Sequence, residues 1–149
     1  ANIWDEFKCV GPAGHFILQE NTKNKLFLGT GTGLVPLYNQ ILEGLKRNSW
    51  EVYQLVFWVR YEKDLFYLQE FQDLKERYPK TFYYHLVTSR DEWKGIINKG
   101  YVTDFLSSKV VSQYDEYYLC WAPSMIESSQ EKLSELWVSV ESVYFEKYA

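Results

Sequence analysis

The chain has 149 residues and a formal net charge of −4, with a pI near 5.2, which suits one domain with its own core. This acidic balance argues against nucleic acid or an anionic membrane as the main partner, and no apolar run approaches the roughly 20 residues that span a bilayer. Cys9 and Cys120 are too few for a disulfide scaffold or a cysteine-ligated metal cluster, and the chain shows no signal-peptide pattern, so we expect a cytoplasmic protein without a metal site.

Two short apolar runs come first. Residues 7–10 and 15–18 are joined by a Gly-Pro turn at 11–14, which predicts a hairpin. Because a lone hairpin is marginal in water, we expect it to pack on the rest of the chain or to be the end of another sheet. Residues 19–24 form a polar connector.

A glycine-rich stretch follows the connector. The apolar run 26–28 meets Gly29, Gly31 and Gly33, and Pro36 stands at the start of an apolar helical pattern. The stretch predicts a strand, a tight turn and a helix, since glycine permits positive φ and proline suits a first helical turn. Free N–H groups and the helix dipole at that helix start favour a phosphate. The alternative is a plain connecting turn, because G-T-G-T-G is not the G-x-G-x-x-G fingerprint.

The rest of the chain alternates between strand and helix patterns. Further strands are predicted at residues 52–59, 82–87, 117–120 and 143–145. Helices are predicted at residues 65–75, with Asp64 as the cap, at 101–106 and at 125–136, and a long loop at 88–100.

This alternation predicts an α/β fold with a doubly wound, mainly parallel five-stranded sheet flanked by helices. In such sheets the ligand lies at the carboxyl ends of the strands, at the point where the strand order reverses. Four segments should meet on that edge, namely residues 29–35, 60–64, 88–99 and 120–124.

Four sequence blocks resemble the nicotinamide-binding half of the ferredoxin–NADP reductase superfamily. They are GPAGHFIL at 11–18, GTGTGLVP at 29–36, SRDEWKGIINKGYVTD at 89–104 and YLCWAPSM at 118–125. The FEKYA ending resembles the oxygenase-reductase branch. The resemblance implies an oxidoreductase domain that passes hydride from NADP or NAD to FAD, for an acceptor protein such as ferredoxin or flavodoxin.

The resemblance also implies roles for single residues. Gly29, Thr30, Gly31 and Thr32 would hold the pyrophosphate, in a turn completed by Gly33 and Pro36. Cys120 would lie beside the nicotinamide, and the alternative is a small buried hydrophobic residue. Tyr148 matches a terminal aromatic residue near the flavin, with a loose tail residue as the alternative.

Other positions resemble the site for the adenosine end of the cofactor. Ser89 and Arg90 follow the third strand, where the family binds the adenosine ribose, and Lys99 and Tyr101 have spacings that resemble the plant-type NADP-binding set. A solvated charged loop is the alternative. Arg60 stands where an NAD-type carboxylate would be expected. Charge complementarity slightly favours NADPH over NADH.

Two departures from the family pattern qualify the resemblance. Trp121 follows the cysteine where the family usually has glycine, so its ring would crowd the cofactor or replace a stacking group; Pro123 and Met125 complete the block. The R-x-Y-[ST] flavin motif is missing, so residues 1–24 are interpreted as the end of a flavin barrel with a linker, and 25–149 as the NAD(P)H-binding domain. FAD would then be held mainly by the flavin domain of a longer parent protein. The alternative is a nucleotide-binding regulatory module without redox activity.

Overall fold

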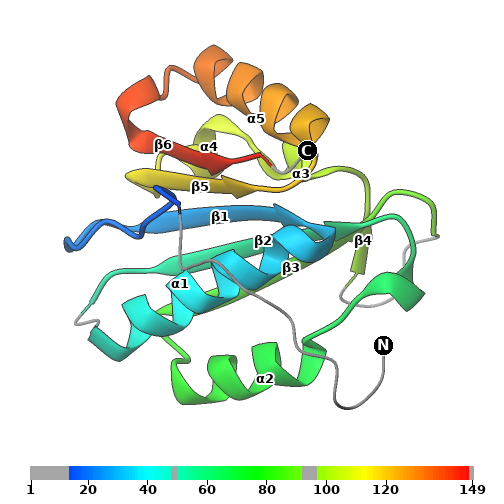
Figure 1. The fold of residues 1–149 in the computed structure, drawn as a ribbon, viewed down its shortest axis with the longest axis horizontal. Helices are drawn as coiled ribbons and strands as arrows, with labels where there is room; N and C mark the ends of the chain where they lie inside the picture. Colours follow the sequence, from blue (N-terminus) through cyan, green and yellow to red (C-terminus); the bar gives the residue numbers. More distant parts are fainter. Residues whose placement is uncertain (1–13, 48–49, 92–96, 148–149) are drawn as a thin grey trace, which may run out of the picture.

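The computed structural model describes residues 14–47, 50–91 and 97–147. Within these residues, six strands form one sheet in the order β4-β3-β2-β1-β5-β6, and every neighbouring pair is parallel (Figure 1). The strands are β1 (Lys25–Thr30), β2 (Tyr53–Val59), β3 (Phe82–Thr88), β4 (Ile97–Lys99), β5 (Glu116–Cys120) and β6 (Val143–Glu146). The doubly wound α/β prediction is confirmed, with six strands instead of five.

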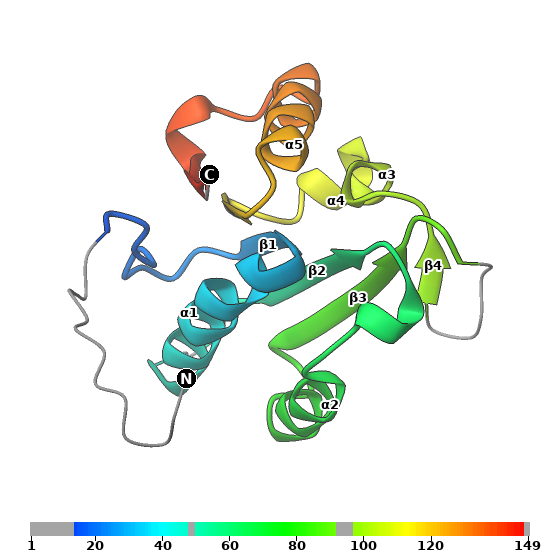
Figure 2. The ribbon, with the colours of Figure 1, turned by 45° about the vertical axis from the view of Figure 1, so that its right-hand side comes forward.

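Helices cover both faces of the sheet (Figure 2). One face carries α1 (Leu34–Arg47) and α2 (Leu68–Arg77), and the other carries α3 (Val102–Phe105), α4 (Ser108–Val111) and α5 (Pro123–Glu135). Three short 3₁₀ turns are η1 (Gly31–Gly33), η2 (Glu62–Asp64) and η3 (Val140–Ser142). Across the described ranges, no helix has the length and apolar character needed to cross a membrane.

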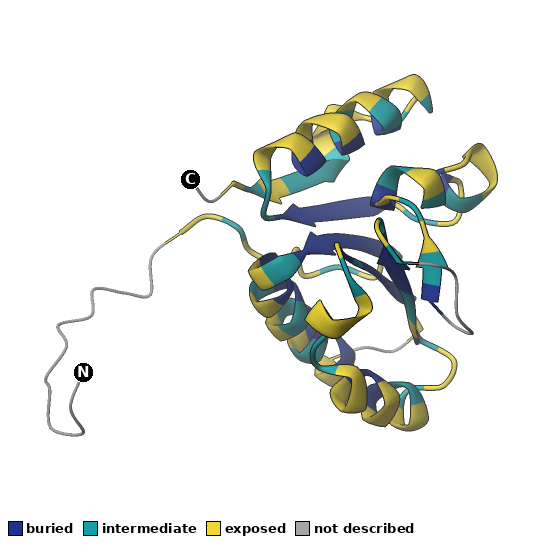
Figure 3. Ribbon diagram, turned by 90° about the vertical axis from the view of Figure 1, so that its right-hand side faces the viewer, coloured by how far each residue is buried: buried dark blue, intermediate teal, exposed yellow. Residues whose placement is uncertain are grey.

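The central strands are buried on both faces, as parallel strands between two helical layers must be. Every residue of β1 is buried, and Figure 3, which views the carboxyl ends of the strands, shows the central strands buried between the helices. Phe27 packs in the core under α1 and α2, whereas Leu26 and Leu28 pack in the core under α3 to α5. The strand order reverses between β1 and β5, which predicts a ligand crevice at their carboxyl ends.

The structure corrects three local predictions. Residues 15–18 form no strand, and the N–H of Ile17 donates to the His15 carbonyl at 3.0 Å instead; residues 7–10 lie outside the described residues. The predicted loop at 88–100 contains β4, which pairs with the end of β3. Asp64 does not cap α2, because it lies in η2 and the helix starts only after Tyr67, whose φ is +62°.

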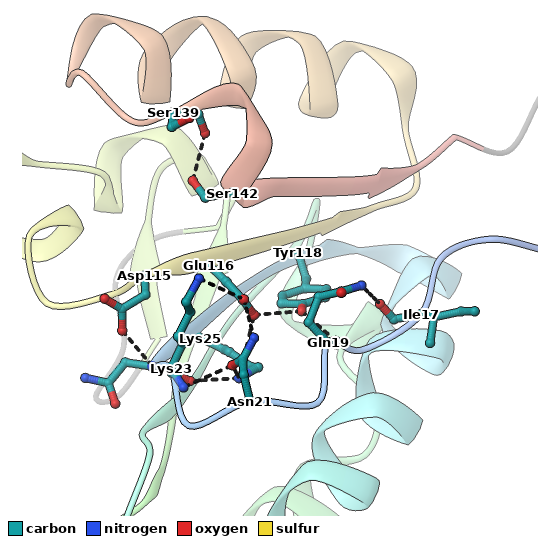
Figure 4. A network of polar contacts seen from close by, with 11 residues as sticks. Ile17, Gln19, Asn21, Lys23, Lys25, Asp115, Glu116, Tyr118, Ser139 and Ser142 are labelled. Carbon is teal, nitrogen blue, oxygen red and sulfur yellow. Dashed lines mark hydrogen bonds and ion pairs between the residues drawn. The ribbon is translucent and has the colours of Figure 1, made fainter.

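A buried ionic network fixes the connector to the amino end of the sheet (Figure 4). Lys25 Nζ lies 3.6 Å from Glu116 Oε2, and the two side chains are 0% and 2% exposed. Asn21 donates to Glu116 Oε1 at 2.6 Å and accepts from Lys25 Nζ at 2.8 Å. The Tyr118 hydroxyl donates to Glu116 Oε2 at 2.9 Å and accepts from the N–H of Gln19 at 3.0 Å. Burial lowers the pKa of the Lys25 ammonium, and the charge of Glu116 opposes that shift.

We expect Glu116→Ala to lower the free energy of unfolding by about 3–5 kcal/mol, because it leaves the Lys25 ammonium buried without its carboxylate. Glu131→Ala on the exposed side of α5 is the control and should change it by less than about 0.5 kcal/mol. Urea unfolding followed by circular dichroism measures both. Equal effects of the two substitutions would contradict this role of the ion pair.

Candidate functional site

A cleft of about 540 Å³ lies where the carboxyl ends of β1, β2 and β5 meet the starts of α3 and α5. Its walls are mostly apolar, with a few polar groups, which is the usual character of a small-molecule site. The described residues that line it are Thr30, Gly31, Trp58, Val59, Arg60, Asp64, Tyr101, Val102, Thr103, Trp121, Ala122, Ser124, Met125 and Ser128. The cleft is therefore at the strand-order reversal, where the sequence predicted it.

The glycine turn forms one wall of the cleft. The turn that follows β5 packs directly against it. A Cβ on Gly33 would lie 2.3 Å from the Cβ of Trp121 and 2.6 Å from the Cys120 carbonyl oxygen. Gly31 has a φ of +51°, and the N–H of Leu34 donates to the Gly31 carbonyl. Glycine at position 33 permits the close approach, and glycine at position 31 permits the left-handed conformation.

The start of the continuous helical segment formed by η1 and α1 gives this wall the character of an anion site. The first N–H groups of a helix have no intrahelical acceptors and carry the positive end of the helix dipole. Pro36 is the third residue of α1, so the prediction that it belongs to the first turn is confirmed. Six residues were predicted for this turn. Thr30 and Gly31 line the cleft. The other four belong to the same segment and are not among the lining residues: Gly29, Thr32, Gly33 and Pro36.

Trp121, in the turn that follows β5, packs against the glycine turn. Its φ is +90°, and its ring lies beside Gly31, since a Cβ on Gly31 would be 3.4 Å from the indole Nε1. Trp121 and Gly31 both line the cleft. The bulky residue in the family's glycine position therefore takes up space at the glycine turn.

Cys120, the last residue of β5, is fully buried and is not among the residues that line the cleft. Burial raises the pKa of its thiol to about 12, with a further contribution from the charge of Glu146. The thiol is thus neutral at physiological pH. Its surroundings are those of a small core residue, and its action beside a nicotinamide stays a prediction. Tyr148 lies outside the described residues.

Another part of the cleft lining consists of aromatic and charged side chains. The rings of Trp58 and Tyr101 have centroids 5.8 Å apart at an interplanar angle of 30°, and Trp58 Nε1 donates to the Gly100 carbonyl at 3.1 Å. Tyr101 remains 59% exposed, which leaves ring surface for a ligand. Among the described lining residues, Arg60 and Asp64 are the charged ones and have opposite signs.

The other predicted adenosine residues do not line this cleft. The Arg90 guanidinium donates to the Tyr61 hydroxyl at 3.1 Å, and the N–H of Arg90 donates to the Arg60 carbonyl at 3.0 Å. Lys99 lines a neighbouring cavity of about 350 Å³, which shares Tyr101 with the cleft. Ser89 lies beside Arg90, outside the lining set. Of the predicted Ser-Arg-Lys-Tyr set, the structure brings Tyr101 alone to the cleft.

Sequence reasoning missed several lining residues. Trp58 near the end of β2, Asp64 in η2, and Thr103 in α3 were not singled out for the cleft. Ser124 and Ser128 were missed although their spacing places both on one face of α5. Met125 lines the cleft, whereas Pro123 starts α5 and is not among the lining residues, and cofactor binding by both stays a prediction. In the part of the chain that the structure describes, no three His, Cys, Asp or Glu residues gather as metal ligands.

A family profile described as "Oxidoreductase NAD-binding domain" matches residues 27–131. The chain belongs to this family. The match runs from β1 into α5 and so includes the glycine turn and the turn at Trp121.

Curated relatives match the whole chain. The 2-halobenzoate 1,2-dioxygenase electron transfer component of Burkholderia cepacia is 31% identical over 152 residues, covering 100% of this chain and 44% of that protein. The toluate 1,2-dioxygenase electron transfer component of Pseudomonas putida is 29% identical over 151 residues, covering 100% of this chain and 44% of that protein. The chain thus spans less than half the length of these relatives, which are oxidoreductase components.

Solved structures agree on the fold. The Amycolatopsis cytochrome P450 reductase GcoB superposes with a TM-score of 0.83 at 28% identity, over 92% of this chain and 42% of that one. A ferredoxin NADP+ reductase from Neisseria gonorrhoeae, with bound FAD and NADP, has a TM-score of 0.74 at 17% identity, over 91% of this chain and 61% of that one. The resemblance to the ferredoxin–NADP reductase superfamily is confirmed.

We expect Cys120 to resist alkylation in the folded protein, because it is buried and its thiol pKa is raised to about 12. The measurement uses Cys9→Ser protein, which leaves Cys120 as the sole cysteine of the sequence, with iodoacetamide at pH 8 and mass spectrometry. Labelling should be slow in buffer and fast in 6 M urea. Equally fast labelling in both conditions would show that the thiol is accessible to small molecules.

Proposed function

We propose that the cleft binds NADH or NADPH and that the chain is the cofactor-binding domain of a flavin-dependent oxidoreductase. Hydride would pass from the nicotinamide to FAD, which then serves a one-electron acceptor such as ferredoxin or flavodoxin. One observation carries the proposal: a glycine turn faces a cleft at the strand-order reversal of an NAD-binding-domain fold.

The residues present fit a dinucleotide. The cleft volume of about 540 Å³ lies within the usual range for small-molecule sites. The turn at Gly31, where the helical segment of η1 and α1 begins, offers N–H groups to a diphosphate. Tyr101, backed by Trp58, offers a flat aromatic surface for a base. Arg60 supplies a positive charge at the same end.

The share of this chain in the reaction is binding and orientation. The nicotinamide and the flavin supply the hydride chemistry itself. The turn at Gly31 fixes the diphosphate and so the reach of the nicotinamide, while Ser124 and Ser128 present hydroxyls on the α5 side. Cys120 acts here as a neutral side chain that packs beneath the turn.

The domain arrangement is part of the proposal. We infer that residues 25–149 bind the nicotinamide cofactor, and that 1–24 contain the end of a flavin barrel and the linker. The chain spans 44% of the halobenzoate dioxygenase component, which leaves length for a flavin domain in such a protein. FAD would be held mainly by that domain.

A nucleotide-binding regulatory module without redox activity is the second candidate. It is favoured by Trp121, whose ring takes up space at the glycine turn. Diaphorase activity of the full-length protein separates the two candidates. NAD(P)H-dependent ferricyanide reduction supports the reductase, whereas nucleotide binding without flavin or reduction supports the regulatory module.

Gly31→Trp should abolish nucleotide binding, because a second large ring beside that of Trp121 would block the turn. Isothermal titration of the chain with NADH, NADPH and ADP measures the effect. Ser134→Trp adds the same ring at an exposed position near the other end of α5 and should leave affinity unchanged. Unchanged affinity in Gly31→Trp would mean that the turn is not the site.

Arg60→Ala should weaken NADPH binding about tenfold more than NADH binding. The extra phosphate of NADPH carries negative charge, and Arg60 is the cation among the described lining residues. Arg90→Ala is the matched control, because its guanidinium is bonded to Tyr61 outside the cleft. An equal loss for both cofactors, or a larger NADPH loss in Arg90→Ala, would place the 2′-phosphate elsewhere.

A further inference from the structure

The backbone at Trp121 holds its side chain in one direction. Its φ of +90° lies in the left-handed region that favours glycine. The N–H of Trp121 donates to the Glu146 carbonyl of β6 at 3.2 Å, which ties the residue to the sheet. On the other side Gly33 approaches so closely that its own Cβ would lie 2.3 Å from that of Trp121. The main chain is therefore fixed between β6 and the glycine turn, and the Cβ of Trp121 faces that turn.

The indole ring continues in that direction and lies against Gly31. A Cβ on Gly31 would be 3.4 Å from the indole Nε1 and 3.6 Å from Cδ1, so the pyrrole edge of the ring is next to the turn. Gly31 and Trp121 both line the cleft. The ring is thus in van der Waals contact with the position that a Gly31 side chain would take.

We propose that the Trp121 indole is a cover on the phosphate-binding turn, which a dinucleotide must displace before its diphosphate reaches the N–H groups there. The proposal rests on the proposed function of the cleft. A bound phosphate oxygen lies about 3 Å from the N–H nitrogen that donates to it. The indole edge lies on the side of Gly31 that a side chain would take, so a phosphate oxygen that approaches the turn from that side meets the ring.

Displacement needs a rotation of the side chain alone. Because β6 and Gly33 fix the backbone, the ring moves about its side-chain bonds. Trp121 lines the cleft and is only partly buried, so its ring has space into which it can rotate. Trp121 therefore lowers the affinity for ligands that carry a diphosphate and leaves the affinity for a nucleoside without phosphate unaffected. It is a specificity-determining residue of the turn.

The test compares Trp121→Gly and Trp121→Ala with the unsubstituted chain. Both remove the ring, and only the glycine also suits the positive φ, so agreement between them assigns the effect to the ring. Both should bind ADP and NADH about tenfold more tightly, because no side chain has to be displaced and ordered elsewhere. The affinity for adenosine, measured by ligand-observed NMR, should stay within about twofold.

Trp137→Gly is the matched control. Trp137 is also a tryptophan with positive φ, +64°, and it is 95% exposed beyond the far end of α5. Its replacement should leave ADP affinity unchanged. Stopped-flow binding gives a second readout: the observed rate should level off at high ADP for the unsubstituted chain and rise linearly for Trp121→Gly.

Three outcomes would decide against the cover. Unchanged ADP affinity in both Trp121 variants would show that the ring does not compete with the diphosphate. Weaker ADP binding would make the indole part of the binding surface. If neither the unsubstituted chain nor the variants bind ADP or NADH, the proposed function itself is overturned, and the cover with it.

Discussion

The contact between two turns at the carboxyl end of the sheet determines the rest of the site. β1 and β5 are neighbours in register, with Gly29 opposite Cys120, so the segments that follow them must pass each other at once. They do so because Gly33 has no side chain: a Cβ there would overlap the main chain at Cys120. This approach sets the glycine turn beside the turn that leads into α5, and the cleft lies where the ends of β1, β2 and β5 meet the starts of α3 and α5.

The same two strands are joined at their amino ends by different chemistry. Lys25 and Glu116 are register partners there, and their buried ion pair also holds Asn21 of the connector. A buried pair contributes little net stability but is strongly destabilising when broken. Its effect here is geometric, because it fixes where the connector meets the sheet. The connector is therefore held at the amino end of the sheet, and the cleft forms at its carboxyl end.

Local patterns predicted β1, the glycine turn, α1 and the parallel order, because each has a short-range physical cause in burial or backbone freedom. β4 was missed, since Ile97–Lys99 is three residues long, has mixed polarity and depends on pairing with β3. The position of Arg90 was also beyond the sequence: a hydrogen bond to Tyr61, 29 residues away, holds it outside the cleft. Spacing placed Arg90 on the correct edge of the sheet but gave no information on the direction of its side chain.

Trp121 combines a bulky side chain with a backbone conformation that favours glycine. A bulky residue in a left-handed conformation costs on the order of 1–3 kcal/mol, and it persists only where its neighbours fix the backbone. Gly33 and the Glu146 carbonyl provide that restraint. Glycine at this position would remove both the strain and the ring beside Gly31. The chain thus retains a residue that is unfavourable for its own backbone at the point where the turn meets the cleft, and such local conflicts concentrate at functional sites. The strain and the occupied cleft have one common cause, because the main-chain direction that costs energy is also the one that aims the indole at the turn.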